Sequence, residues 1–103
     1  MALKPSDFHV LLALHEGPLH GYGIMKHVER ESGGTVRLEI GSLYRLLGRL
    51  LDSGLIAEGA GDERRRFYQL SRAGRRALRA EAERLAGLVD LVRMRKLLPE
   101  ADA

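Results

Sequence analysis

One stretch of the sequence, residues 41–54 (GSLYRLLGRLLDSG), constrains the fold more than any other. Its leucines recur at intervals of three and four residues, which is the spacing of a helix that presses one face on a core: Leu43, Leu46, Leu47, Leu50 and Leu51. Ser42 is a candidate N-cap for this helix, and Gly54 is a candidate for the residue after its end. The sequence therefore predicts an amphipathic helix with a wide buried face.

The outer face of the same helix is small, cationic and able to form hydrogen bonds. Opposite the leucines lie Gly41, Arg45, Gly48 and Asp52, with Ser42 and Arg49 on one edge and Tyr44 on the other. Such a face fits the major groove of DNA, where arginine, serine and tyrosine side chains reach phosphates and base edges. Taken alone, the stretch is equally compatible with an ordinary helix whose outer face is solvated.

Positive charge is concentrated in one segment. The chain has 103 residues and a formal net charge of +3, but residues 62–79 hold seven arginines against two acidic residues. A local basic patch on an otherwise mildly acidic chain favours a polyanionic partner over a generally basic surface. A solvated charged loop is the alternative interpretation.

The first third of the chain predicts two short helices. Ser6 and Asp7 are candidate N-caps for a helix over residues 8–15, which Gly17 and Pro18 end. A second helix is expected to begin near residue 21 and to end at residues 33–34, a pair of glycines. Residues 35–40 alternate apolar and polar side chains, which indicates an extended connection or a small strand.

The remainder predicts a β-hairpin and a long helix. Residues 55–58 and 65–70 have the pattern of two strands around a polar, glycine-containing turn. From Ser71, a candidate N-cap, no proline interrupts the chain until Pro99, so a helix is expected over residues 71–98.

The first and last helices have more apolar surface than one small domain can cover. We therefore expect a homodimer in which both helices contact a second copy of the chain. The residues predicted to form this interface are Phe8, Leu11, Leu12, Leu85, Leu88, Val89 and Val92.

The order of these elements defines the expected fold class. The chain should be mainly α-helical with a small β-hairpin, arranged as a winged helix-turn-helix with a long C-terminal dimerisation helix. Residues 1–70 would form the DNA-binding domain, residues 71–98 the dimerisation helix, and residues 99–103 a frayed tail.

The residues also carry a family resemblance. His20-Gly21-Tyr22, residues 41–45 (GSLYR), residues 54–56 (GLI) and residues 65–71 (RRFYQLS) with Gly74 resemble the PadR family of bacterial transcriptional regulators. The resemblance implies a dimeric winged-helix DNA binder, usually a repressor, whose last helix forms the dimer with help from the first. The short C-terminal part is similar to the subgroup with a single C-terminal helix, in which some members bind flat aromatic compounds at the dimer interface.

The resemblance assigns roles to individual positions. Ser42, Tyr44 and Arg45 would face DNA at the start of the recognition helix, Tyr22 would approach a phosphate, and the wing would contact DNA through Arg64, Arg65 and Arg66. Arg49 is added as a DNA contact because of its place on the edge of the helix face.

Other function classes find little support. The chain has no cysteine, which excludes disulfides and thiolate metal sites. His20, His27 and Glu31 are too widely spaced for a compact metal site, and no nucleophile, phosphate-loop or dinucleotide motif is present, so neither catalysis nor a cofactor is expected. The N-terminal apolar run is too short and too often interrupted for a signal peptide or membrane span, so we expect a cytoplasmic protein.

The sequence thus predicts a homodimeric, sequence-specific regulator that binds a near-palindromic operator in double-stranded DNA. A repressor relieved by a small aromatic or hydrophobic effector is the expected form. The alternative is a winged-helix adaptor that binds another protein through its leucine-rich helices and does not bind DNA.

Overall fold

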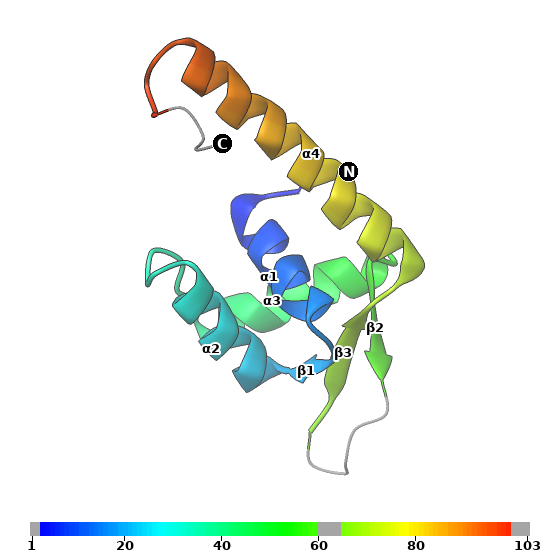
Figure 1. Ribbon diagram of the computed structural model, residues 1–103. Helices are drawn as coiled ribbons and strands as arrows, with labels where there is room; N and C mark the ends of the chain where they lie inside the picture. The colour runs from blue at the N-terminus through cyan, green and yellow to red at the C-terminus, as the bar shows by residue number, and fades with distance from the viewer. Residues whose placement is uncertain (1–2, 60–64, 100–103) are drawn as a thin grey trace.

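The computed structural model describes residues 3–59 and 65–99. The chain forms α1 (Pro5–His15), β1 (Leu19–His20), α2 (Gly21–Glu31), α3 (Ile40–Asp52), β2 (Ile56–Gly59), β3 (Phe67–Leu70) and α4 (Arg72–Met94) (Figure 1). The predicted fold class, a mainly helical winged helix-turn-helix with a long last helix, is confirmed.

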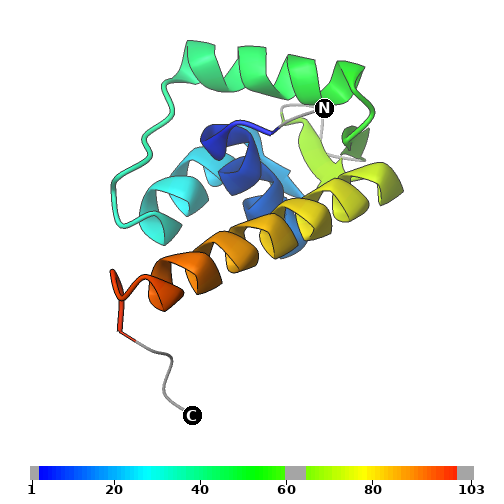
Figure 2. The same cartoon turned by 90° about the horizontal axis from the view of Figure 1, so that it is seen from above.

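The hydrophobic core lies around α1, which has α3 on one side and α4 on the other (Figure 2). Val10, Leu11 and Leu14 of α1 are buried there. The candidate recognition helix α3 contributes the predicted leucine face. Leu51 is partly buried, and the other four leucines are buried: Leu43, Leu46, Leu47 and Leu50. The spacing of these leucines alone fixes which side of α3 remains outside.

The first turns of two helices differ from the prediction. α3 begins at Ile40 after an extended Glu39 and has no side-chain cap, so the prediction of Ser42 as its N-cap is wrong. α1 begins at Pro5, one residue after Lys4. Asp7 is therefore not the N-cap; its carboxylate accepts a hydrogen bond of 3.0 Å from the backbone N–H of Lys4 and so completes the first turn.

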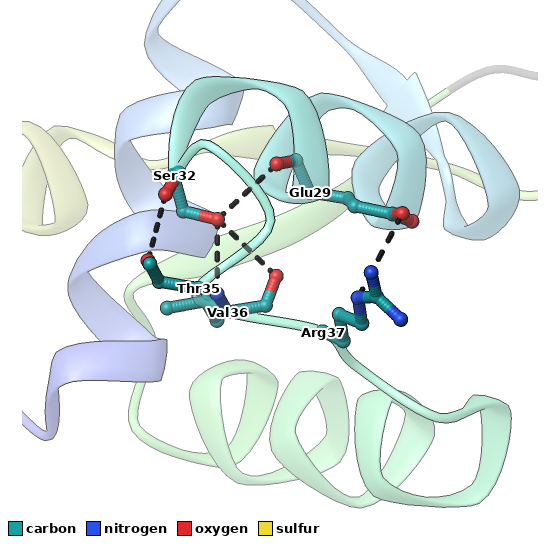
Figure 3. Close-up of polar contacts among 5 residues, drawn as sticks. All are labelled: Glu29, Ser32, Thr35, Val36 and Arg37. Atoms are coloured by element: carbon teal, nitrogen blue, oxygen red, sulfur yellow. Dashed lines mark hydrogen bonds and ion pairs between the residues drawn. The ribbon is translucent and has the colours of Figure 1, made fainter.

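The connection between α2 and α3 is an extended segment and not a strand. After Gly33 and Gly34, whose φ angles are +64° and +83°, it is held by Ser32, whose hydroxyl oxygen accepts a hydrogen bond of 3.0 Å from the N–H of Val36. Thr35 donates to the carbonyl of Ser32 at 2.7 Å, as Figure 3 shows. These local bonds set the path by which the chain enters α3.

The small sheet has three antiparallel strands in the order β1-β3-β2. The predicted hairpin is confirmed, with the first strand shifted by one residue and the second shorter than expected, and Tyr68 and Leu70 of β3 are buried on one face. β1 is an unpredicted strand in which Leu19 pairs with Tyr68 and His20 with Phe67. Two residues carry too little pattern for a strand to be predicted from sequence.

The start of α4 is joined closely to the end of α3. Ser71 is the N-cap as predicted: its hydroxyl oxygen accepts from the N–H of Gly74 at 2.9 Å and its hydroxyl donates to the carbonyl of Gly54 at 2.6 Å. Gly54 has a φ of +74°, as expected for the residue that follows a helix. α4 ends at Met94 and not at residue 98, and its C-terminal half extends beyond the other helices (Figure 1).

Gly74→Ala is expected to destabilise the fold. A Cβ at this position would lie 1.9 Å from the carbonyl oxygen of Leu55, a backbone atom that cannot rotate away. The first turn of α4 would have to shift, at a cost of about 1–3 kcal/mol or more in the free energy of unfolding. Urea denaturation measures this loss, and Gly87→Ala is the control, since a Cβ there meets nothing within 4 Å. Equal stability of the two variants would contradict the close packing at Gly74.

Candidate nucleic-acid interface

A polar hollow of about 440 Å³ opens between the start of α2, the outer face of α3 and the sheet. Its lining is rich in groups that donate hydrogen bonds: His20, Gly21, Tyr22, Tyr44, Arg65, Arg66 and Tyr68. Four of these residues, Tyr22, Tyr44, Arg65 and Arg66, were predicted from sequence as DNA contacts, and the fold brings them together from α2, α3 and the segment before β3. Tyr22 and Arg66 are far apart in the sequence, and the antiparallel pairing of β1 with β3 brings them to the same hollow.

Tyr44 occupies the edge of α3 that faces this hollow. Its side chain is 53% exposed, and its hydroxyl lies so close to Gly21 that a Cβ there would be only 2.9 Å away. The absence of a side chain at Gly21 thus allows Tyr44 to lie against the start of α2. Tyr68 forms the floor, where burial, together with the nearby Tyr44 and Glu58, raises the pKa of its phenol, so the hydroxyl keeps its proton and can donate it.

His20 is a residue of this hollow that the sequence prediction missed as a site residue. Its Nδ1 accepts a hydrogen bond of 3.0 Å from the N–H of Gly23 and so caps α2, while its Nε2 lies 3.3 Å from Nη1 of Arg65. A neutral ring whose Nδ1 accepts carries its proton on Nε2. His20 and Arg65 therefore present two donors side by side, an arrangement suited to an anionic oxygen.

Three more of the predicted DNA contacts, Tyr22, Arg45 and Arg66, are exposed, and Ser42 is half-buried. Tyr22 is 61% exposed at the start of α2, with Nζ of Lys26 5.4 Å from the centre of its ring. Arg45 lies on the outer face of α3 and its Nη2 donates to the hydroxyl of Ser42 at 3.3 Å. Arg66 is exposed and forms an ion pair of 3.5 Å with Glu58. Arg64 lies outside the described residues.

Arg49, also predicted to contact DNA, has a partner in its own chain that the sequence did not predict. Its guanidinium donates two hydrogen bonds to Asp7, at 2.8 Å and 3.1 Å, so it holds a carboxylate of its own chain where a DNA contact was expected. The reason is that Asp7 is fully buried and a buried carboxylate needs a cationic partner. The residue spacing of α3 predicts the correct edge of the helix for Arg49, but a partner 42 residues away leaves no signal in local spacing.

The ionisation of Asp7 follows from this pairing. Burial alone would raise the pKa of its carboxyl, but the hydrogen bonds from Arg49 and from the N–H of Lys4, with the positive charges of both residues, outweigh it and lower the pKa below its usual value. Asp7 is therefore ionised at neutral pH and links the start of α1 to α3.

A second feature of the surface is apolar and lies on α4. Leu88 and Leu91 are 45% and 42% exposed, and Val89 and Met94 are exposed beside them. Among the residues predicted for a dimer interface, Leu12 is also exposed, whereas Phe8, Leu85 and Val92 are half-buried. The prediction for Leu11 is wrong, because its side chain is fully buried in the core of its own subunit and cannot contact another.

Within the described part of the chain, no group of three histidine or acidic side chains could hold a metal ion. Over the same residues, none of the helices combines the length and the apolar character that a membrane span requires.

Comparisons with known proteins agree on one family. Residues 10–80 match the model of the transcriptional regulator PadR-like family. The chain is also 44% identical over 88 residues to an uncharacterized 37.1 kDa protein of transposon TN4556 in Streptomyces fradiae, a match that covers 85% of this chain and 25% of that protein. The chain thus spans about a quarter of the length of this relative.

Two solved structures show the same fold. A PadR family transcription regulator of Clostridium difficile R20291 superposes with a TM-score of 0.76 at 20% identity and covers 88% of this chain and 97% of that one. Bacillus subtilis PadR in complex with operator DNA superposes with a TM-score of 0.69 at 23% identity and covers 77% of this chain and 47% of that one.

Proposed function

The chain belongs to the PadR-like family of transcriptional regulators, and from this premise we propose that it acts as a homodimeric, sequence-specific DNA-binding repressor. Members of this family are regulators of transcription and not enzymes. The single observation that supports the proposal most is the hollow beside α3, in which tyrosine hydroxyls, His20 and two arginines surround one space. Donors of these kinds bind the phosphates of DNA.

In the proposed complex α3 enters the major groove. Ser42, Tyr44 and Arg45 face the DNA, and Arg45, on the outer face, reads base edges. Tyr22 and the wing arginines Arg65 and Arg66 contact phosphates along one side of the groove. Bacillus subtilis PadR, which has the same fold, forms a complex with operator DNA, and this supports the proposal that the chain binds DNA.

The second half of the proposal is a homodimer formed through α4. The exposed leucines of its C-terminal half, Leu88 and Leu91, lie beside the apolar stripe that begins in the core at Leu78, and a second copy of the same surface would cover them. A two-fold dimer places its two α3 helices in successive major grooves, so the operator should be a near-palindrome.

We further propose that a small aromatic or hydrophobic effector relieves repression from the α1–α4 surface. An apolar hollow of about 320 Å³ lies there, lined by Leu12, Leu78 and Ala82 with the side chains of His15, Arg75 and Arg79 at its rim. A ligand bound between the subunits would change the distance between the two α3 helices, and thereby the affinity for the operator. The cytoplasm is the proposed location of a protein that acts in this way on bacterial DNA.

Arg45→Ala tests the proposed reading of bases. A duplex selected from a randomised pool by the wild-type protein serves as operator, and a shuffled duplex of the same composition as reference. We expect the variant to lose about 1–3 kcal/mol of its preference for the operator, because a lost base contact weakens only the specific complex.

Arg66→Ala is the matched comparison, since it removes an equal charge from the wing. It should weaken binding to both duplexes by the same factor and reduce the salt dependence. Fluorescence anisotropy at several salt concentrations measures both effects. If Arg45→Ala also weakens both duplexes equally, Arg45 does not read bases; if the wild type selects no sequence, the proposed function is wrong.

A further inference from the structure

A second polar hollow, of about 460 Å³, lies on the opposite edge of α3 from the first. It is formed by the start of α1, the end of the α2–α3 connection and the first turns of α3, and its lining combines three cationic side chains with two hydroxyls: Lys4, Ser6, Leu38, Ser42, Arg45, Leu46 and Arg49. The sequence comparison with the family assigned no role to Lys4 or Ser6.

The positive charge of this hollow exceeds the negative charge near it. Arg49 is neutralised by Asp7, whose carboxylate is fully buried beneath the surface. The charges of Lys4 and Arg45 remain, and both side chains are exposed. The hydroxyls of Ser6 and Ser42 line the same space as hydrogen-bond donors. Lys4 and two hydroxyls around one space, with the positive charge of Arg45 beside them, suit a single phosphate group.

The geometry of α3 separates the two hollows. Successive residues of a helix are about 100° apart, so Tyr44 and Ser42 lie about 160° from each other around the axis, on the two edges of the exposed face. A helix in the major groove has a sugar-phosphate backbone on each side, because the groove is only about 12 Å wide. One hollow faces each backbone when the outer face of α3 is directed at the bases.

We propose that this second hollow, called the Lys4 hollow, binds a phosphate of the DNA backbone, a proposal that rests on the proposed function. The phosphate belongs to the strand opposite the one contacted by the first hollow, which contains Tyr22. Lys4 supplies the charge and Ser6 a hydroxyl. Asp7 positions them: its buried carboxylate accepts from the backbone N–H of Lys4 at 3.0 Å and from Arg49 of α3 at 2.8 Å. The start of α1 is therefore held in a fixed place beside the recognition helix.

Lys4→Ala tests the proposal with the full chain and the selected operator duplex. The substitution leaves the backbone N–H that Asp7 accepts, so the fold should be retained. Loss of one phosphate contact in each of the two subunits should reduce the slope of log K against log salt by about 1.8. That change means that the gain in affinity for each tenfold fall in salt is about 60-fold smaller, on operator and shuffled duplex alike.

Two further variants separate a phosphate contact from a general effect of charge. Lys4→Arg should retain the wild-type slope. Lys96→Asn removes an equal charge after the end of α4, where asparagine tolerates the φ of 60°, and should also retain it. Ethylation interference on the operator gives a direct readout: the wild type should show two groups of sensitive phosphates per half-site, on opposite strands, and Lys4→Ala should lose one group only.

The outcomes are distinct. A slope that is reduced in Lys4→Ala but not in Lys4→Arg or Lys96→Asn, together with loss of one group of sensitive phosphates, supports the phosphate site in the Lys4 hollow. If Lys4→Ala has the wild-type slope while Arg66→Ala has a reduced slope, the phosphate site in the Lys4 hollow is wrong but the proposed function is unaffected. Absence of any preference of the wild type for the selected duplex overturns both.

Discussion

Replacing Arg49 by alanine is expected to lower the free energy of unfolding by about 3–5 kcal/mol at neutral pH, because it leaves a buried carboxylate without its cationic partner. Asp7 is fully buried, and the only other hydrogen bond to it in the described part of the chain comes from the N–H of Lys4. Since small domains are stable by about 5–15 kcal/mol, this loss is a large part of the total. Urea denaturation at a fixed protein concentration measures it.

The contribution of Asp7 to the free energy of unfolding should depend on pH in opposite ways in the wild type and in Arg49→Ala. In the wild type the pKa of Asp7 is lowered, so the stability that its ionised form contributes is present above the ordinary range of aspartate, near pH 4, and is lost as the pH falls. In Arg49→Ala the burial remains without the partner, so the pKa should rise above the ordinary value and protonation should stabilise the fold. The difference in stability between the proteins should therefore shrink from pH 7.5 to pH 4.5.

Asp7→Asn combined with Arg49→Ala is the matched control. The double variant has no buried charge, so it should be more stable at neutral pH than Arg49→Ala alone. A loss of stability in Arg49→Ala that is the same at both pH values, and is not reduced by Asp7→Asn, would contradict the role of the ion pair.

Replacing Leu88 and Leu91 together by glutamate is expected to abolish the proposed dimer without unfolding the subunit. Both side chains are already about half exposed in the single chain, at 45% and 42%, so the charges meet water there. In a dimer they would be buried against like charges. Sedimentation equilibrium should give half the wild-type mass, and operator affinity should fall by about 100-fold or more, because each half-site is then bound alone.

Ala86→Glu provides the control on the same helix. Ala86 is exposed and lies about 160° around α4 from Leu88 and about 140° from Leu91, on the side of the helix opposite both leucines. It should leave mass and operator affinity unchanged. A wild type that is monomeric at micromolar concentration, or a Leu88→Glu/Leu91→Glu variant that binds the operator as the wild type does, would contradict the dimer proposal.

The features that followed from the sequence are those set by local spacing. The leucines of α3 lie at three- and four-residue intervals, so the helical period fixes both the buried face and the outer face, which carries Tyr44 and Arg45. The cap at Ser71 and the glycine at position 54 were equally local. A helix, its caps and the side it presents are properties of neighbouring residues.

The features that were missed depend on residues far apart in the chain. The ion pair between Arg49 and Asp7 was not predicted, because nothing near Arg49 in sequence shows that Asp7 is buried beneath it. Leu11 was assigned to an interface because α1 is apolar on several sides, and its burial depends on where the other helices pack. His20 was not predicted as a site residue because its place beside Arg65, 45 residues away, arises only when β1 pairs with β3, although its cap on α2 is a local contact.

The central proposal is that two copies of the chain together bind a specific DNA sequence. The most direct test is titration of the wild-type protein into a labelled duplex selected from a random pool, and into its shuffled counterpart, at two salt concentrations. The account predicts binding to the selected duplex about 1,000-fold or more tighter than to the shuffled one, with two chains per duplex and weaker binding at higher salt. Equal, weak binding to both duplexes would contradict it and favour a winged-helix adaptor for another protein.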